Sequence, residues 1–217
     1  MFYLAIDGNI HVHTLHPDDA EVLFQLVERN RSRLRPWIHP SALPETMKAA
    51  RKLTIESFFN SFANPMDGML KYFDYFQELD RYIPPSNPPM EMGIWFDGAL
   101  VGEIMLGHLQ DNDTAAEFGY WLDGEREGQG IITRCVSGLM NYAIDNMGTA
   151  RFIIGCAVEN RRSRAIPERL GYRWQATIPG GEIVGKTIYD RVIYAIGAAQ
   201  WRERNQDQRE ISTHYEA

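Results

Sequence analysis

The chain has 217 residues, 44% of them hydrophobic and 24% charged, which is typical of an ordinary globular protein at the upper end of a single domain. A net charge of −7 argues against non-specific nucleic-acid binding, and no apolar run approaches the ~18 residues of a membrane helix. Because the first residues also lack the basic and apolar regions of a signal peptide, we expect a cytoplasmic protein that contacts neither nucleic acid nor membrane.

Two short strands and two helices are predicted in the first part of the chain. Residues 2–6 and 11–15 have strand patterns. Pro17, followed by two aspartates, is typical of a helix start. The proline before Trp37 keeps the chain out of a helix, so Trp37 is expected on a loop. A second helix is expected over residues 44–62.

Histidines and cysteines give no pattern that favours a metal site. His11 and His13 share one strand face, but no cysteine or carboxylate accompanies them at ligand spacing. Cys135 and Cys156 lie in apolar contexts on different elements, so we expect reduced, buried thiols. No metal is therefore predicted.

An aromatic and proline-rich segment follows at about residues 64–90. Apolar residues at helical spacing predict a helix over residues 66–79, and the prolines after residue 83 predict an extended loop. Aromatic residues at this spacing belong to a core more often than to a ligand site.

The middle of the chain predicts a strand meander and a crossover. Three antiparallel strands are expected over residues 92–96, 100–109 and 117–122. A helix over residues 129–146 then leads to an almost continuously apolar strand, residues 151–158, which is typical of a strand covered on both faces. A strand, a helix and a strand in this order predict a parallel crossover.

The last part of the chain predicts a short helix and a hairpin. The helix begins after Asn160 and ends at Gly171, and two antiparallel strands are expected over residues 172–178 and 188–196. Residues 202–217 are predicted to form a polar C-terminal tail.

A glycine-rich turn at Gly128 and Gly130 joins the third strand of the meander to its helix. Backbone N–H groups at a helix N-terminus lack helical partners, and the helix dipole attracts anions, so the turn is a candidate site for a phosphate group. Turn geometry alone also explains two glycines.

Several motifs together resemble the GNAT superfamily of acyl-CoA-dependent N-acetyltransferases, and the RimJ/RimL branch in particular. They are LRPW from Leu34, EFGYWL from Glu117, GQGIIT from Gly128, CAVENRRSRAIPERLGY from Cys156 and YDRVIYAI from Tyr189. The resemblance covers residues 9–201. It implies an α/β (α+β) fold with a single mixed, mostly antiparallel sheet, flanked by helices and with splayed central strands.

The resemblance also implies a site for acetyl-CoA. Its pantetheine arm would lie between the splayed strands, and its pyrophosphate would lie on the backbone amides of the glycine turn. The residues implied in donor binding are Trp121, Leu122, Glu127, Gly128, Gln129, Gly130, Ile131, Ile132, Thr133, Asn160 and Ser163. Glu127 stands where the family pattern has Gln or Arg. A carboxylate there would repel pyrophosphate, so we expect only its amide to bind and Arg126 to supply the missing cation.

By the same resemblance, Glu117 is the candidate general base and Ser163 the candidate partner of the departing thiolate. A plain salt-bridged carboxylate and an ordinary helix serine remain the alternatives. Trp37 and Tyr120 are implied on the acceptor side. Pro167 departs from the family pattern, and its place inside a helix predicts a kinked or short, irregular helix.

These features predict an enzyme that transfers acetyl from acetyl-CoA to a primary amine by direct attack. The acceptor is a protein N-terminus or a small-molecule amine, and the protein is a monomer or a homodimer. The segment at 64–90 is expected to cover the acceptor cleft or to form a subunit contact. The alternative is a non-catalytic acyl-CoA-binding sensor or interaction protein on the same fold.

Overall fold

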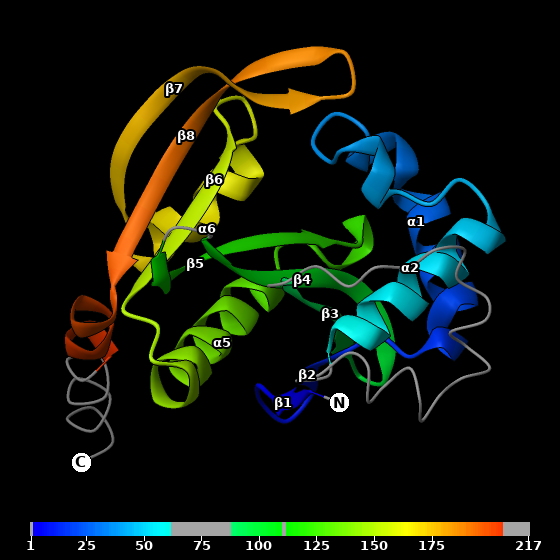
Figure 1. The fold of residues 1–217 in the computed structure, drawn as a ribbon, viewed down its shortest axis with the longest axis horizontal. Helices are drawn as coiled ribbons and strands as arrows, with labels where there is room; N and C mark the ends of the chain where they lie inside the picture. The colour runs from blue at the N-terminus through cyan, green and yellow to red at the C-terminus, as the bar shows by residue number, and fades with distance from the viewer. Residues whose placement is uncertain (1, 62–87, 110–111, 206–217) are drawn as a thin grey trace.

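The computed structural model describes residues 2–61, 88–109 and 112–205. One eight-stranded sheet, with strand order β1-β2-β3-β4-β5-β6-β8-β7, forms its centre (Figure 1). The strands are β1 (Tyr3–Ala5), β2 (Ile10–His13), β3 (Met90–Phe96), β4 (Ala99–Leu109), β5 (Asn112–Leu122), β6 (Arg151–Ala157), β7 (Arg173–Val184) and β8 (Thr187–Gly197). All neighbouring strands are antiparallel except β5 and β6, which are parallel.

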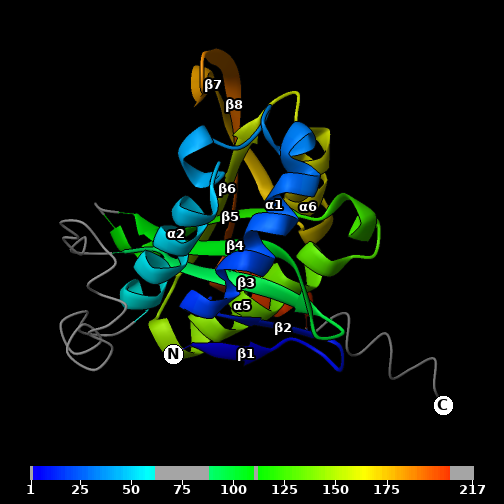
Figure 2. The ribbon, with the colours of Figure 1, turned by 90° about the vertical axis from the view of Figure 1, so that its right-hand side faces the viewer.

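Helices cover both faces of the sheet, as Figures 1 and 2 show. The helices α1 (Ala20–Leu34) and α2 (Met47–Asn60) lie on one face, and α5 (Ile131–Met147) and α6 (Arg161–Leu170) lie on the other. The main core forms between α5 and strand residues such as Phe118 and Ile154. A second core packs α1 against Trp121. This arrangement confirms the predicted mixed, mostly antiparallel sheet flanked by helices.

The two central strands separate at the middle of the sheet. β5 and β6 pair only from Ala115 with Arg151 to Phe118 with Ile154. Beyond that point β5 continues on β4 as far as Leu122, and β6 continues on β8 as far as Ala157. The predicted splay is confirmed, and it leaves a gap between the ends of the two strands.

The last hairpin is longer than predicted. β7 runs on to Val184 and β8 begins at Thr187, whereas the predicted strands covered residues 172–178 and 188–196. The added part includes Pro179, Gly180 and Gly181, residue types that are common in turns. A register shift between Ile178 and Glu182 absorbs these residues as an irregularity within β7. The hairpin therefore extends toward the loop after α1, as Figure 1 shows.

Three further details refine the predicted elements. The second helix begins at Met47, where Thr46 caps it, and ends at Asn60, just short of the predicted range. Residues 198–205 are helical and Trp201 is buried, so the predicted tail begins inside a helix; residues 206–217 lie outside the described residues. Most of the predicted aromatic segment, residues 62–87, also lies outside them, and its role stays a prediction.

Candidate active site

A cavity of about 860 Å³ lies at the splay between β5 and β6. Its walls come from the ends of both strands, the glycine turn before α5, the start of α6, the end of α1 with the loop after it, and the β7–β8 hairpin. The cavity includes all of the residues predicted for donor and acceptor binding except Gln129. The backbone carbonyl of Gln129 accepts a hydrogen bond from Arg134 Nη2 at 3.3 Å.

The glycine turn presents open backbone at one end of the cavity. Gly128 and Gly130 have φ angles of 76° and 72°, the left-handed region in which a side chain is strained. A Cβ at either position would meet nothing within 4 Å. α5 begins at Ile131, so the N–H groups of its first turn have no intrahelical acceptor. The space, the amides and the helix dipole fit the pyrophosphate of an acyl-CoA donor.

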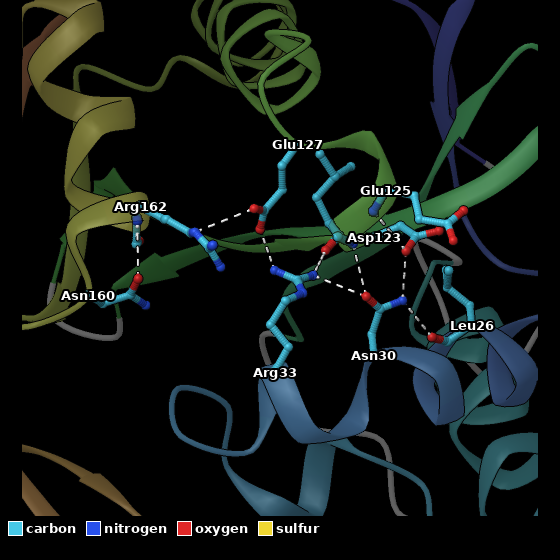
Figure 3. Close-up of polar contacts among 11 residues, drawn as sticks. Leu26, Asn30, Arg33, Asp123, Glu125, Glu127, Asn160 and Arg162 are labelled. Carbon is cyan, nitrogen blue, oxygen red and sulfur yellow. Dashed lines mark hydrogen bonds and ion pairs between the residues drawn. The ribbon is translucent and has the colours of Figure 1, made fainter.

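A buried polar cluster fixes the start of the loop that leads into this turn to α1 (Figure 3). The Asn30 amide donates to Leu26 O and to Asp123 Oδ1, both at 2.9 Å, and Asn30 Oδ1 accepts from Gly124 N at 2.9 Å. Arg29 donates to Asp123 Oδ2 at 2.6 Å. Burial alone would raise the pKa of Asp123, but the hydrogen bonds from Asn30 and Arg29 hold it below its ordinary value.

Glu127 turns its carboxylate toward two arginines from different helices. It forms an ion pair with Arg33 at the end of α1, and another with Arg162 in the first turn of α6 at 3.4 Å (Figure 3). Arg126, which was expected to supply the missing cation, places its guanidinium over the ring of Phe96, 5.4 Å from its centroid. Arg33 and Arg162 are therefore the cations that contact Glu127.

Asn160, Ser163 and Tyr120 meet at the start of α6. Asn160 Oδ1 caps the helix by accepting from Ser163 N at 3.2 Å, and Ser163 Oγ lies 3.5 Å from the Tyr120 hydroxyl. The Tyr120 hydroxyl donates to Ser163 O at 3.1 Å. Tyr120, expected on the acceptor side, therefore points toward α6, because side chains alternate along β5. Burial raises the pKa of Tyr120, so it stays protonated at neutral pH.

The opposite face of β5 forms the other side of the cavity. Glu117 makes an ion pair with Arg191 of β8, and Arg191 Nε lies 3.4 Å from Glu182 of β7. The Arg191 guanidinium lies close against the backbone of Gly155. Two carboxylates and one guanidinium give this side a net negative charge, which suits an ammonium group.

Aromatic residues bound the same side. Trp37 lies on the loop after α1, as predicted, and its ring centroid is 5.7 Å from that of Tyr189 on β8. Trp121, from the same face of β5 as Glu117, donates from Nε1 to Glu103 at 2.8 Å. Trp121 and Trp37 both line the cavity.

Sequence reasoning missed Arg33, Arg191 and Glu182. Arg33 resembles an ordinary basic residue in the last turn of a helix. Arg191 carried a usable signal, because it is a charged residue within an apolar strand pattern. Glu182 gave none, since it follows residues that read as a turn.

Two further features of the described residues bear on other types of site. They contain no group of three or more His, Cys, Asp and Glu residues that could hold a metal ion. None of the described helices has the length and apolar character needed to cross a membrane.

A splayed mixed sheet with a glycine turn at a helix N-terminus and a cavity between the separated strands defines the acyl-CoA-dependent acyltransferase class. The sequence pattern of the family described as "Acetyltransferase (GNAT) domain" matches residues 9–173, well over half of the chain. The chain belongs to this GNAT acetyltransferase family, which confirms the predicted resemblance.

Known relatives agree with this assignment over nearly the whole chain. The "Putative ribosomal N-acetyltransferase YdaF" of Bacillus subtilis (strain 168) is 30% identical over 201 residues, 93% of this chain and 98% of the relative. A crystal structure named "Probable acetyltransferase" is 31% identical, with a TM-score of 0.71 over 93% of this chain and 99% of that one.

A third match was solved in complex with coenzyme A. RimL, a ribosomal L7/L12 alpha-N-protein acetyltransferase solved with coenzyme A, is 19% identical with a TM-score of 0.70, and covers 90% of this chain and 98% of its own. At this identity the match shows the fold. Together the findings support an acetyl-CoA-dependent N-acetyltransferase of the RimJ/RimL type, and none of them supports the non-catalytic alternative.

Proposed function

We propose that the acceptor is the free α-amino group of a peptide or protein, in line with the name of the similar "Ribosomal L7/L12 alpha-N-protein acetyltransferase" RimL. The observation that carries this proposal is the pair of carboxylates, Glu117 and Glu182, which share one guanidinium in the cavity wall. Their net negative charge attracts an ammonium group, and the flanking Trp37 and Tyr189 offer apolar surface to the residues that follow it.

Glu117 is proposed as the general base. An ammonium group cannot attack a carbonyl, so the amine must first lose a proton to a nearby acceptor. Glu117 lines the cavity at the last paired residues of β5 and β6, beside the gap where the thioester is proposed to lie. The ion pair with Arg191 holds the Glu117 carboxylate in place. The alternative to a general base is that Glu117 only forms this salt bridge.

Ser163 is proposed to stabilise the departing thiolate. The amine nitrogen forms the new bond to the acetyl carbon, the carbon–sulfur bond breaks, and the electron pair leaves on sulfur. The Ser163 hydroxyl lines the cavity at the first turn of α6, where the helix N-terminus also favours negative charge. Because a serine is a weak acid, its contribution is a hydrogen bond to sulfur more than full proton transfer.

Direct attack fits the state of the one cysteine among the described cavity residues. Burial raises the pKa of the Cys156 thiol, although a hydrogen bond with Ser163 and the nearby Arg164 charge oppose the shift. At neutral pH the group is therefore a thiol and not a nucleophilic thiolate. This supports acetyl transfer without a covalent enzyme intermediate.

Glu117→Gln tests the proposed base with a nearly isosteric side chain. We expect kcat toward an N-terminal serine peptide to fall by about 100-fold or more, while the Kd of acetyl-CoA measured by calorimetry stays within about 2-fold. Glu21→Gln, an exposed carboxylate on α1, is the matched control. Unchanged kcat in Glu117→Gln would remove Glu117 from the mechanism. If the wild-type protein acetylates polyamines or aminoglycosides but no peptide, the proposed peptide acceptor is wrong and a small-molecule amine takes its place.

A further inference from the structure

We propose that Arg33 and Arg162 bind the phosphate groups of acetyl-CoA, and that the Glu127 carboxylate competes with the donor for them. The proposal concerns the donor side alone, so it holds whichever amine is the acceptor. Its starting point is Figure 3, in which Glu127 lies between a guanidinium from α1 and one from α6.

The charges around Glu127 are those of an anion site. Arg33 and Arg162 approach its carboxylate from two sides, and the N-terminus of α5 begins four residues later. Arg169 adds a third guanidinium and donates to Thr133 Oγ1 at 2.9 Å, within the first turn of α5. Three cations and a helix N-terminus attract a diphosphate, which carries more negative charge than a single carboxylate.

Arg33 is held in place by bonds that do not involve Glu127. Its guanidinium also donates to the Leu122 carbonyl and to Asn30 Oδ1, the latter at 3.2 Å. Arg33 is mostly buried, and its Nε has no hydrogen-bond partner among the described residues. When the Glu127 carboxylate leaves, the guanidinium therefore keeps its position and presents a donor group to a new anion.

Arg162 is different, because its side chain is 70% exposed and Glu127 is its one ion-pair partner among the described residues. It can follow an anion that binds at the mouth of the cavity. The Glu127 side chain is 31% exposed and can turn outward from the same turn. Arg33 stays in place and Arg162 moves, and both exchange the Glu127 carboxylate for the phosphate groups of the donor.

The proposal gives Glu127→Gln an unusual outcome, namely tighter binding of the donor. The carboxamide removes the competing charge and keeps the size of the side chain. Since partly exposed ion pairs are weak, we expect the Kd of acetyl-CoA to fall by about 5-fold. Glu125→Gln is the matched control: it makes the same charge change two residues away, on an exposed side chain for which no contact with either arginine is found.

Pantetheine, which lacks the diphosphate and the nucleotide, separates the phosphates from the rest of the donor. Calorimetry should give equal pantetheine affinity for wild-type protein and Glu127→Gln. Arg162→Gln, at an exposed position, should weaken acetyl-CoA binding in the Glu127→Gln background by several fold. Arg33→Gln should do the same, with thermal unfolding checking that the loss of its bond to Leu122 leaves the fold intact.

Each alternative result overturns the proposal. Weaker acetyl-CoA binding in Glu127→Gln would mean that the carboxylate organises the turn. An equal gain in acetyl-CoA affinity in Glu125→Gln would indicate a general charge effect. A gain in pantetheine affinity in Glu127→Gln would show that the phosphate groups are not what Glu127 competes with. Acetyl-CoA affinity unaffected by Arg162→Gln and Arg33→Gln would leave the arginines without this role. Failure of peptide acetylation would bear on the proposed acceptor and on none of these binding measurements.

Discussion

The hydroxyl group of Tyr120 donates to the backbone carbonyl of Ser163, which is the carbonyl that Pro167 leaves without a helical partner. In an α-helix that carbonyl would accept from the N–H of residue 167, and proline has none. A kinked or short, irregular helix was predicted here, but α6 continues through Pro167 to Leu170 and has ten residues. Tyr120 of β5 supplies the hydrogen bond to the Ser163 carbonyl that the proline cannot donate. The proline thereby links β5 to the helix that carries Ser163.

This relationship predicts non-additive effects of two substitutions. Tyr120→Phe should lower the free energy of unfolding by about 1 kcal/mol, because the Ser163 carbonyl loses its donor. In a Pro167→Ala background the helix regains an N–H at residue 167, so the same substitution should cost clearly less. Urea unfolding of the four proteins measures the coupling. Equal costs of Tyr120→Phe in both backgrounds would contradict the prediction.

Gly155 is predicted to control activity through Arg191. A Cβ at this position would come 2.4 Å from Arg191 Nε and 2.6 Å from its Nη2. A flexible guanidinium can move away, so Gly155→Ala should break the ion pair with Glu117 and leave the fold intact. We expect kcat/KM for the peptide to fall by about 10-fold or more, because Glu117 loses its charge-assisted bond to Arg191. Steady-state kinetics beside thermal unfolding measure both quantities.

The matched control for that experiment is Gly102→Ala. Its Cβ would meet the carbonyl oxygen of Trp121 at 2.3 Å, and a backbone atom cannot move aside as a side chain can. We expect Gly102→Ala to lower stability by about 2 kcal/mol or more through overpacking. If Gly155→Ala lost stability to the same extent, a specific effect on Arg191 would be refuted.

Stability is predicted to fall as pH rises through the range set by Glu103. Burial raises the pKa of Glu103 from 4.5 to about 7; the hydrogen bond from Trp121 opposes the shift and the charge of Glu91 adds to it. Between these two values the folded state holds the proton more tightly than the unfolded state, so stability decreases with rising pH. The loss should total about 1 to 3 kcal/mol and be complete about one pH unit above the folded-state pKa. Urea unfolding from pH 4.5 to pH 8 measures it, and Glu103→Gln should flatten this part of the curve.

Asn30 is predicted to matter for donor binding without touching the donor. Asn30→Ala removes the two bonds that tie α1 to Asp123 and Gly124. It also removes the bonds of Asn30 to Leu26 and Arg33 within α1, and it leaves buried partners unsatisfied. We expect a loss of roughly 2 kcal/mol in stability and a weaker Kd for acetyl-CoA, because the glycine turn loses its anchor. The control Asn146→Ala removes an exposed amide with a similar bond to its own helix. Unchanged affinity in Asn30→Ala would show that the turn holds its shape without α1.

Local signals in the sequence predicted most of the fold. The hairpin at Asp97 and Gly98, the parallel crossover and the glycine turn each depend on residues that are near one another in the chain. The side on which Tyr120 lies was also readable, because alternation along β5 separates it from Glu117. The acceptor role of Tyr120 itself stays a prediction.

The ion pairs of the site were not predictable in the same way. Arg33 and Glu127 are 94 residues apart, and Arg191 and Glu117 are 74 apart, so only the folded sheet brings each pair together. Periodicity identifies which face a side chain occupies, but it does not identify the partner that another element brings to that face. The long β7–β8 hairpin was missed for a related reason: an irregularity in β7 absorbs glycines that usually end a strand.

The short parallel pairing between β5 and β6 also bears on the order in which the protein folds and opens. β6, β8 and β7 pair within residues 151–197, whereas the contact with β5 joins this part of the sheet to all of the earlier strands across a few residues. Such a narrow junction is expected to form late and to open first, and amide hydrogen exchange should be fastest along it. A pantetheine arm placed between β5 and β6 would slow that exchange. The substrate would then complete the sheet by bridging the two strands.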